Sequence, residues 1–213
     1  MAIRLLPFRQ YDEQDVVNIF ALTNGEVLES TTGDGAGSNG VFVKVADGNF
    51  DQDVITYGSN SYLGKTDYPF VGADMYPTNP LEVTAASSGN IPLGLTLNQT
   101  AKADENGEKL LYNSTKKEEL QAVLPGQSVP VATKGIFTLA SDAFAGGVSL
   151  SDFTVGDGFE VAATGGSDVG TIGPATVGSA ESIGMVLGTG SRASTNGGLT
   201  DQFGGDYVVV KLG

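Results

Sequence analysis

Short apolar runs alternate with turn residues along most of the chain. The runs are rich in Val, Ile, Phe and Thr, and pairs such as Asn-Gly, Asp-Gly and Pro-Gly stand between many of them. Such pairs supply the backbone conformations that tight hairpins need. The predicted strands are residues 16–22, 41–45, 54–57, 81–85, 93–97, 120–124, 129–133, 136–139, 159–163, 183–187 and 207–212. The pattern therefore predicts a mainly β fold with short hairpins and little helix.

Alternation with a period of two is clearest in residues 93–97 and 41–45. In the first segment every second residue is Leu, and in the second every second residue is Val. Successive side chains of a strand point to opposite faces of the sheet. We therefore expect each of these strands to bury one face only.

The charged segment 114–121 is the one place where the sequence supports a helix. Thr115 and Glu118 have the spacing of a capping box, in which each side chain bonds a backbone N–H at the helix start. The alternative is a β-hairpin across the Pro125-Gly126 turn, because apolar residues flank that turn on both sides. We favour the hairpin.

The composition changes near residues 140–147, beyond which Gly, Ser, Thr and Ala dominate. Residues 41–45 and 208–212 are similar in sequence, which would suit a C-terminal strand that lies near the early one and closes the sheet. The predicted organisation is an N-terminal arm with the first strand (1–22), a β domain (23–140) and a Gly-rich β subdomain or insertion (141–213).

Charge and missing residue types narrow the possible functions. The 213 residues include 25 acidic and 11 basic side chains, a formal net charge of −14, so nucleic-acid phosphates would be repelled. The chain has no Cys, His or Trp, which excludes disulfides, thiolate nucleophiles, imidazole bases and metal sites made of nitrogen or sulfur ligands. We expect no signal peptide and no membrane span, because no apolar run is long enough.

An acidic segment is the sole metal candidate. Asp47, Asp51 and Asp53 stand at alternate positions as in a calcium loop, but Gln52 occupies the place where an EF-hand needs Gly. An EF-hand is thus excluded, and a looser Ca²⁺ site remains as an alternative to a solvated acidic turn. The glycine-rich segment 58–66 has one residue too many for a phosphate loop. We predict no cofactor and no bound metal.

The N-terminal segment is the strongest binding candidate. Its first nine residues contain two of the chain's three Arg residues, no acid, and several apolar side chains. A cationic, apolar arm on an acidic chain suits an acidic or apolar groove of another protein, and its deletion should leave the fold intact. The alternative is an edge strand packed on the chain's own core. The candidate binding residues are Arg4, Leu5, Leu6, Phe8, Arg9 and Tyr11.

Several segments together resemble one family of virion proteins. They are Pro-Leu-Gly-Leu-Thr-Leu (92–97), Asn-Gly-Glu-Lys-Leu-Leu-Tyr (106–112) and, above all, Leu-Pro-Gly-Gln-Ser-Val-Pro-Val-Ala-Thr-Lys-Gly-Ile-Phe-Thr-Leu (124–139). With the opening residues 4–22, they resemble the head decoration, or capsid cement, proteins of tailed bacteriophages. The resemblance covers about a third of the chain.

The resemblance implies a β-barrel-like or β-tulip-like domain that forms a homotrimer and ties neighbouring capsomers together. It implies the major capsid protein as partner, no catalytic residue, synthesis in the host cytoplasm and a place on the virion exterior. Lambda-type decoration proteins are shorter, so the segment beyond Ala140 has no counterpart in them. The alternatives are a tail, baseplate or fibre component, or a β module that binds Ca²⁺ or carbohydrate.

Overall fold

The computed structural model of the chain describes residues 4–18, 21–22, 39–46, 82–100, 110–123, 128–162, 169–175, 182–196, 199–200 and 203–213. This part is built mainly from strands, which confirms the predicted fold class. The strands form two six-stranded sheets and two two-stranded ones. Both large sheets have edge strands, and no closed barrel is found in the described ranges, so the barrel-like expectation is not met there.

The first six-stranded sheet combines the N-terminal strand with the C-terminal half of the chain. Every neighbouring pair in it is antiparallel. Its strands, in spatial order, are β1 (Leu5–Gln10), β10 (Gly135–Ala140), β16 (Gly205–Leu212), β13 (Gly184–Arg192), β11 (Gly158–Val161) and β12 (Ile172–Pro174).

The second six-stranded sheet draws mainly on the middle of the chain. Its pairs are antiparallel except for the parallel pair of β3 and β5. Its strands, in spatial order, are β2 (Val16–Val17), β9 (Val131–Ala132), β6 (Gly94–Thr96), β4 (Phe42–Ala46), β5 (Glu82–Ala85) and β3 (Ala21–Leu22).

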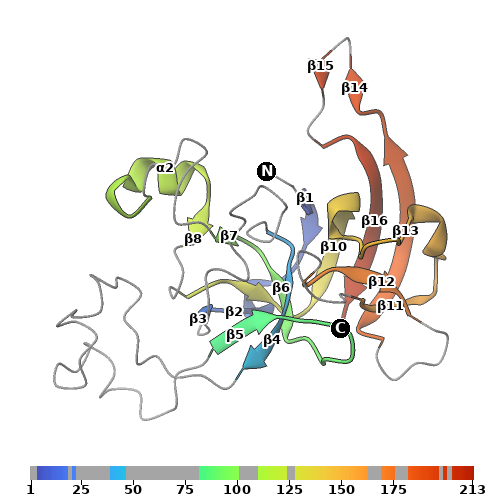
Figure 1. Cartoon of the computed structure of the whole chain (residues 1–213), viewed down its shortest axis with the longest axis horizontal. Coiled ribbons are helices and arrows are strands. Elements are labelled where there is room, and N and C mark those ends of the chain that lie inside the picture. Colours follow the sequence, from blue (N-terminus) through green and yellow to red (C-terminus); the bar gives the residue numbers. More distant parts are fainter. Residues whose placement is uncertain are drawn as a thin grey trace.

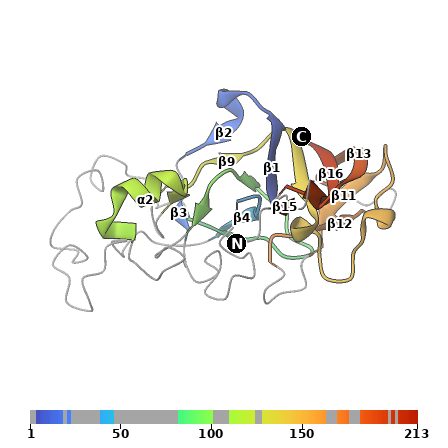
Figure 2. The same cartoon turned by 90° about the horizontal axis from the view of Figure 1, so that it is seen from above.

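The remaining elements are short. Figures 1 and 2 place α2 at one end of the molecule and the strands β11, β12, β13 and β16 at the other, and Figure 1 shows the β14–β15 hairpin projecting beyond the first sheet. These elements are β7 (Gln99–Thr100), β8 (Ala122–Val123), β14 (Thr195–Asn196), β15 (Leu199–Thr200), α2 (Ser114–Glu119) and the 3₁₀ turns Glu13–Asp15, Leu110–Tyr112, Ser141–Ala143 and Leu150–Asp152.

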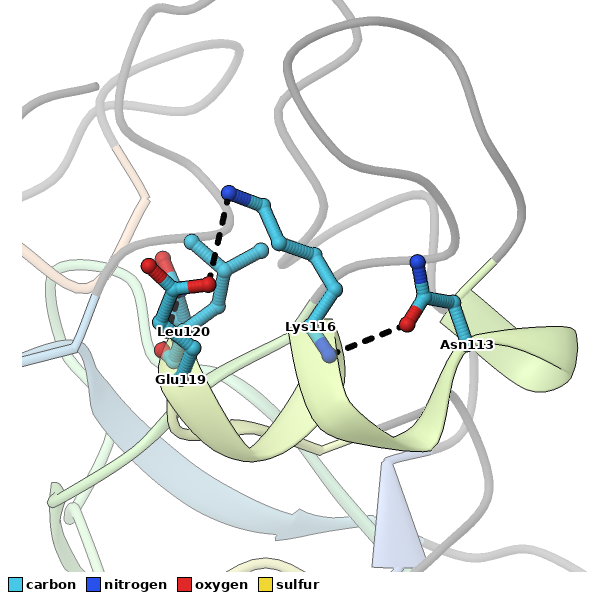
Figure 3. Close-up of polar contacts among 5 residues, drawn as sticks. Asn113, Lys116, Glu119 and Leu120 are labelled. Carbon is cyan, nitrogen blue, oxygen red and sulfur yellow. Dashed lines mark hydrogen bonds and ion pairs between the residues drawn. The ribbon is translucent and has the colours of Figure 1, made fainter.

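The charged segment forms a helix, so the favoured hairpin was wrong. β8, which follows the helix, pairs in parallel with β7 and not with β9 across the Pro-Gly turn. The helix is capped two residues before the predicted capping box, because Asn113 is the N-cap: its Oδ1 accepts from the Lys116 N–H at 3.1 Å. Figure 3 shows this bond and the Lys116 Nζ to Glu119 Oε2 contact of 3.6 Å.

The main hydrophobic core lies between the two large sheets. It contains Phe137, Val208 and Val210 from the first sheet together with Phe42 and Leu95 from the second. The rings of Phe42 and Phe159 meet edge-on, with centroids 6.1 Å apart, and so connect the two sheets directly. Aromatic pairs in this arrangement add to the free energy gained from burial.

A second core covers the opposite face of the second sheet. It contains Val41, Val43, Val83 and Val131, with Val123 of β8 packed against them. The expectation that β4 and β6 bury one face only is therefore wrong. β6 is buried throughout, and β4 is buried on both faces at Phe42 and Val43, whereas Val45 near its end is 52% exposed.

The C-terminal strand has an interior position. β16 lies between β10 and β13 in the first sheet, whereas β4 lies in the second, so the two similar segments 41–45 and 208–212 do not pair. The chain passes between the two large sheets twice, from β1 to β2 and from β9 to β10. The predicted strand 207–212 lies within β16, and the predicted strand 183–187 overlaps β13 from Gly184 onward.

Candidate functional site

The first three candidate binding residues are part of the fold. Arg4, Leu5 and Leu6 are 2%, 3% and 2% exposed. Leu5 is paired with Leu139 in the main core, and Nη1 of Arg4 donates to the Val169 carbonyl at 3.0 Å. The structure therefore agrees with the edge-strand alternative for this segment. None of the three is accessible for docking while β1 stays in the sheet.

The later candidates lie at the edge of the sheet and are more accessible. The pairing of β1 with β10 is irregular between Leu5 and Arg9, a stretch that contains Pro7, which has no N–H to donate. Phe8 is 59% exposed there. The Tyr11 ring stacks on Phe137 with centroids 5.9 Å apart, and the Arg9 guanidinium carbon lies 5.9 Å from the Tyr11 centroid.

Phe8 belongs to a larger surface on the first sheet. The buried residues Phe137 of β10 and Val210 of β16 point into the main core. The residues next to each of them along the strand therefore point to the opposite side of the sheet. That side, which we call the outer face, carries Met185 at 47% and Leu187 at 39% exposure. The apolar residues of the outer face are Phe8, Ile136, Met185, Leu187, Tyr207 and Val209.

Two cations border the outer face. The guanidinium carbon of Arg192 lies 5.5 Å from the centroid of the Phe8 ring, a cation–π contact that joins β13 to β1 across the two strands between them. Lys211 is exposed and lies in register with Ile136 on one side and Met185 on the other. Glu160 of β11 points to the same side, because its neighbours Phe159 and Val161 are buried in the main core, so the border of the outer face carries a carboxylate as well as the two cations.

Two glycines of β13, Gly188 and Gly190, lie on the outer face, where they present no side chain. A Cβ built on Gly188 meets no heavy atom within 4 Å, and one built on Gly190 would lie 2.5 Å from the Tyr207 hydroxyl oxygen. The Tyr207 ring therefore lies over Gly190, while the surface above Gly188 is open. Gly188 is in register with Val209, so an apolar side chain of another molecule has room to rest there.

The carboxylate of Asp152 takes part in the cap of a short 3₁₀ turn. Oδ2 of Asp152 accepts from the Ser149 backbone N–H and hydroxyl, both at 2.8 Å, and these bonds lower the pKa of Asp152 below its ordinary value of 3.8. Among the described residues no three Asp or Glu side chains gather as metal ligands would. The candidates Asp47, Asp51 and Asp53 lie outside the described residues.

Sequence reasoning found Phe8 but missed Met185, Leu187 and Arg192. The signals were present as an apolar run followed by glycines and a lone Arg. What was missing was the pairing of β13 with β16, which places these residues in the same sheet as β1 and on the same face as Phe8.

In the part of the chain that the structure describes, no helix has the length and apolar character required to cross a bilayer.

Comparison of the chain with protein-family models, with curated proteins and with solved structures finds no match.

Proposed function

We propose that this chain is a non-enzymatic structural protein that binds the outside of a phage capsid and cements neighbouring capsomers. The observation that carries the proposal is the outer face of the first sheet. Three large apolar side chains, Phe8, Met185 and Leu187, are exposed on one face of a well-packed sheet. Gathered exposed apolar residues of this kind are typical of surfaces that bind other proteins.

The placement of the family-like segments supports a structural function. Val129 and Val131 are fully buried, and Phe137 and Leu139 are at most 1% exposed. The segment 124–139 thus supplies β9 and β10, the two strands where the chain passes from the second large sheet back to the first. Its residues belong to the folding framework, which is where a family of binding scaffolds would share sequence.

The physics of cementing requires area and many equivalent contacts. A protein that binds the assembled shell but not its separate subunits stabilises the shell by mass action. Interfaces of this kind bury hundreds of Å² on each partner around an apolar centre with a polar border. In this proposal the chain acts as a homotrimer, and its partner is the major capsid protein.

The test is to mix the purified chain with expanded, undecorated heads and image them. We expect the chain to occupy regular positions on the outer surface and to raise the temperature at which the heads break. Binding to isolated tails or baseplates and not to heads would contradict the proposal and favour a tail component. A rise in melting temperature with added Ca²⁺ and no binding to heads would favour a calcium-binding module.

A further inference from the structure

We infer that the outer face of the first sheet docks onto an acidic surface of the capsid protein that has an apolar centre. The inference rests on the proposed function and names the partner surface for it. It also replaces the N-terminal arm as the docking element, because Phe8 is the one apolar residue in the described part of the arm that belongs to this face and is well exposed.

The exposed apolar side chains of the outer face are grouped, unlike those elsewhere. Phe8, Met185 and Leu187 are connected by the half-buried side chains of Ile136 and Val209 on the strands between them. Four other large apolar residues are highly exposed in the described part of the chain: Val45 lies on β4 of the second sheet, and Ile91, Tyr112 and Val155 lie on loops or turns. Single exposed residues are ordinary, whereas a group is not.

The border charges select the partner. Among the charged side chains placed on this face, the cations Arg192 and Lys211 outnumber the one carboxylate, Glu160, so an acidic surface is attracted and a basic one repelled. A second copy of the chain placed face to face would bring the same two cations of both copies into one interface. The excess of positive charge on this face of both copies disfavours self-association through it.

Arg192 is suited to both parts of such an interface. Its guanidinium lies over the Phe8 ring, which holds the side chain against the apolar centre. A stacked guanidinium can still donate in its own plane to a carboxylate, since the N–H groups point outward from the edge of the plane. The contact therefore places a positive charge next to the apolar anchor.

Gly188 offers a substitution that changes the face without disturbing the fold. Because no heavy atom lies within 4 Å of a Cβ built there, a longer side chain projects from the surface. We compare Gly188→Glu with Gly188→Lys, which have similar bulk and opposite charge. A third variant, Met185→Ser, removes part of the apolar centre, and Ile91→Ser is the control at an exposed apolar residue outside the face.

The experiment measures attachment of these full-length variants to undecorated heads, after their melting temperatures are shown to equal that of the wild type. We expect Gly188→Glu to attach roughly tenfold more weakly than Gly188→Lys, and Met185→Ser to lose affinity while Ile91→Ser keeps it. Raising the salt concentration should reduce the difference in affinity for heads between Gly188→Glu and Gly188→Lys, because salt screens the charges.

The outcomes separate this inference from the proposed function. If the wild type attaches and all face variants attach equally well, the outer face is not the docking surface, and the decoration function stands. If Met185→Ser instead dissociates a soluble oligomer of the chain, the face is occupied by a second copy and the inference is wrong. If the wild type does not attach to heads at all, the proposed function fails.

Discussion

The two large sheets differ in how their faces are covered. The second sheet has an apolar core on each side: Phe42 of β4 points into the main core, and its neighbours Val41 and Val43 point into the second core. The first sheet has the main core on one side only, and its other side exposes Phe8 and Met185. Both are mainly antiparallel and built from similar residues.

The difference shows where binding can evolve in this fold. A sheet covered on both sides can change little without loss of stability, because close-packed interiors do not tolerate changes in volume. A sheet with one open face can carry exposed apolar and charged residues at little cost to folding. The second sheet is therefore the framework, and the first sheet is the one that presents a surface to partners.

The largest contrast is expected between two phenylalanines. Phe42 is 1% exposed and Phe8 is 59% exposed. Phe42→Ala should lower the free energy of unfolding by about 3–5 kcal/mol, because it leaves a cavity where the two sheets meet. Phe8→Ala should change it by no more than about 0.5 kcal/mol. Urea unfolding followed by circular dichroism measures both, and similar losses would show that the outer face is not open.

The N-terminal strand provides the next contrast. Leu6 is 2% exposed, whereas Arg9 is exposed at the sheet edge. Leu6→Ala should cost about 2–5 kcal/mol and Arg9→Ala about 0.5 kcal/mol or less. Deletion of residues 1–10 should then unfold or strongly destabilise the chain, contrary to the arm expectation from the sequence. A deletion variant with an unchanged melting temperature would instead support the expectation that residues 1–10 form an arm outside the fold.

A third contrast lies within β13. A Cβ at Gly184 would be 2.1 Å from the Lys211 carbonyl oxygen, whereas one at Gly188 meets nothing within 4 Å. Gly184→Ala should cost about 1–3 kcal/mol because the backbone of β16 must move, and Gly188→Ala should be close to neutral. Thermal unfolding of the two variants measures this. Equal effects would mean that β13 is covered at both positions.

The smallest effect is expected at Asp152, whose carboxylate is fully exposed. Because the pKa of Asp152 is lowered in the folded state, its bonds with Ser149 stabilise the fold above pH 3.8 and lose that effect as the pH falls through the lowered pKa. Asp152→Asn should therefore melt slightly below the wild type near neutral pH. The two proteins should melt together in strong acid, and a difference that grows with acidity would contradict this assignment.

Local sequence patterns predicted most strands but not their partners. Runs such as 136–139 and 207–212 form strands because their alternation and β-branched residues act locally. The helix at Ser114–Glu119 was missed in favour of a hairpin, since the deciding interaction is the cap from Asn113, just before the segment considered. Burial on both faces of β4 could not be predicted, because it depends on Val123 and Val131 from distant parts of the chain.

The candidate site was predicted only in part for the same reason. The unusual charge of the first nine residues led to six candidates, Arg4, Leu5, Leu6, Phe8, Arg9 and Tyr11, of which the structure exposes Phe8 and Arg9. Burial of Leu5 and Leu6 depends on pairing with β10, which follows in the chain after more than a hundred residues. The contribution of Arg192 to the same surface depends on the strand order of the first sheet.

The chain contains no Cys, so single cysteines can report directly on the open face of the first sheet. Met185→Cys and the control Ile91→Cys replace residues that are 47% and 92% exposed, and both should react readily with a thiol reagent in the free protein. On decorated heads we predict that the cysteine at 185 becomes strongly protected while the one at 91 keeps reacting. Equal reactivity at 185 in the free and the attached chain would contradict the account.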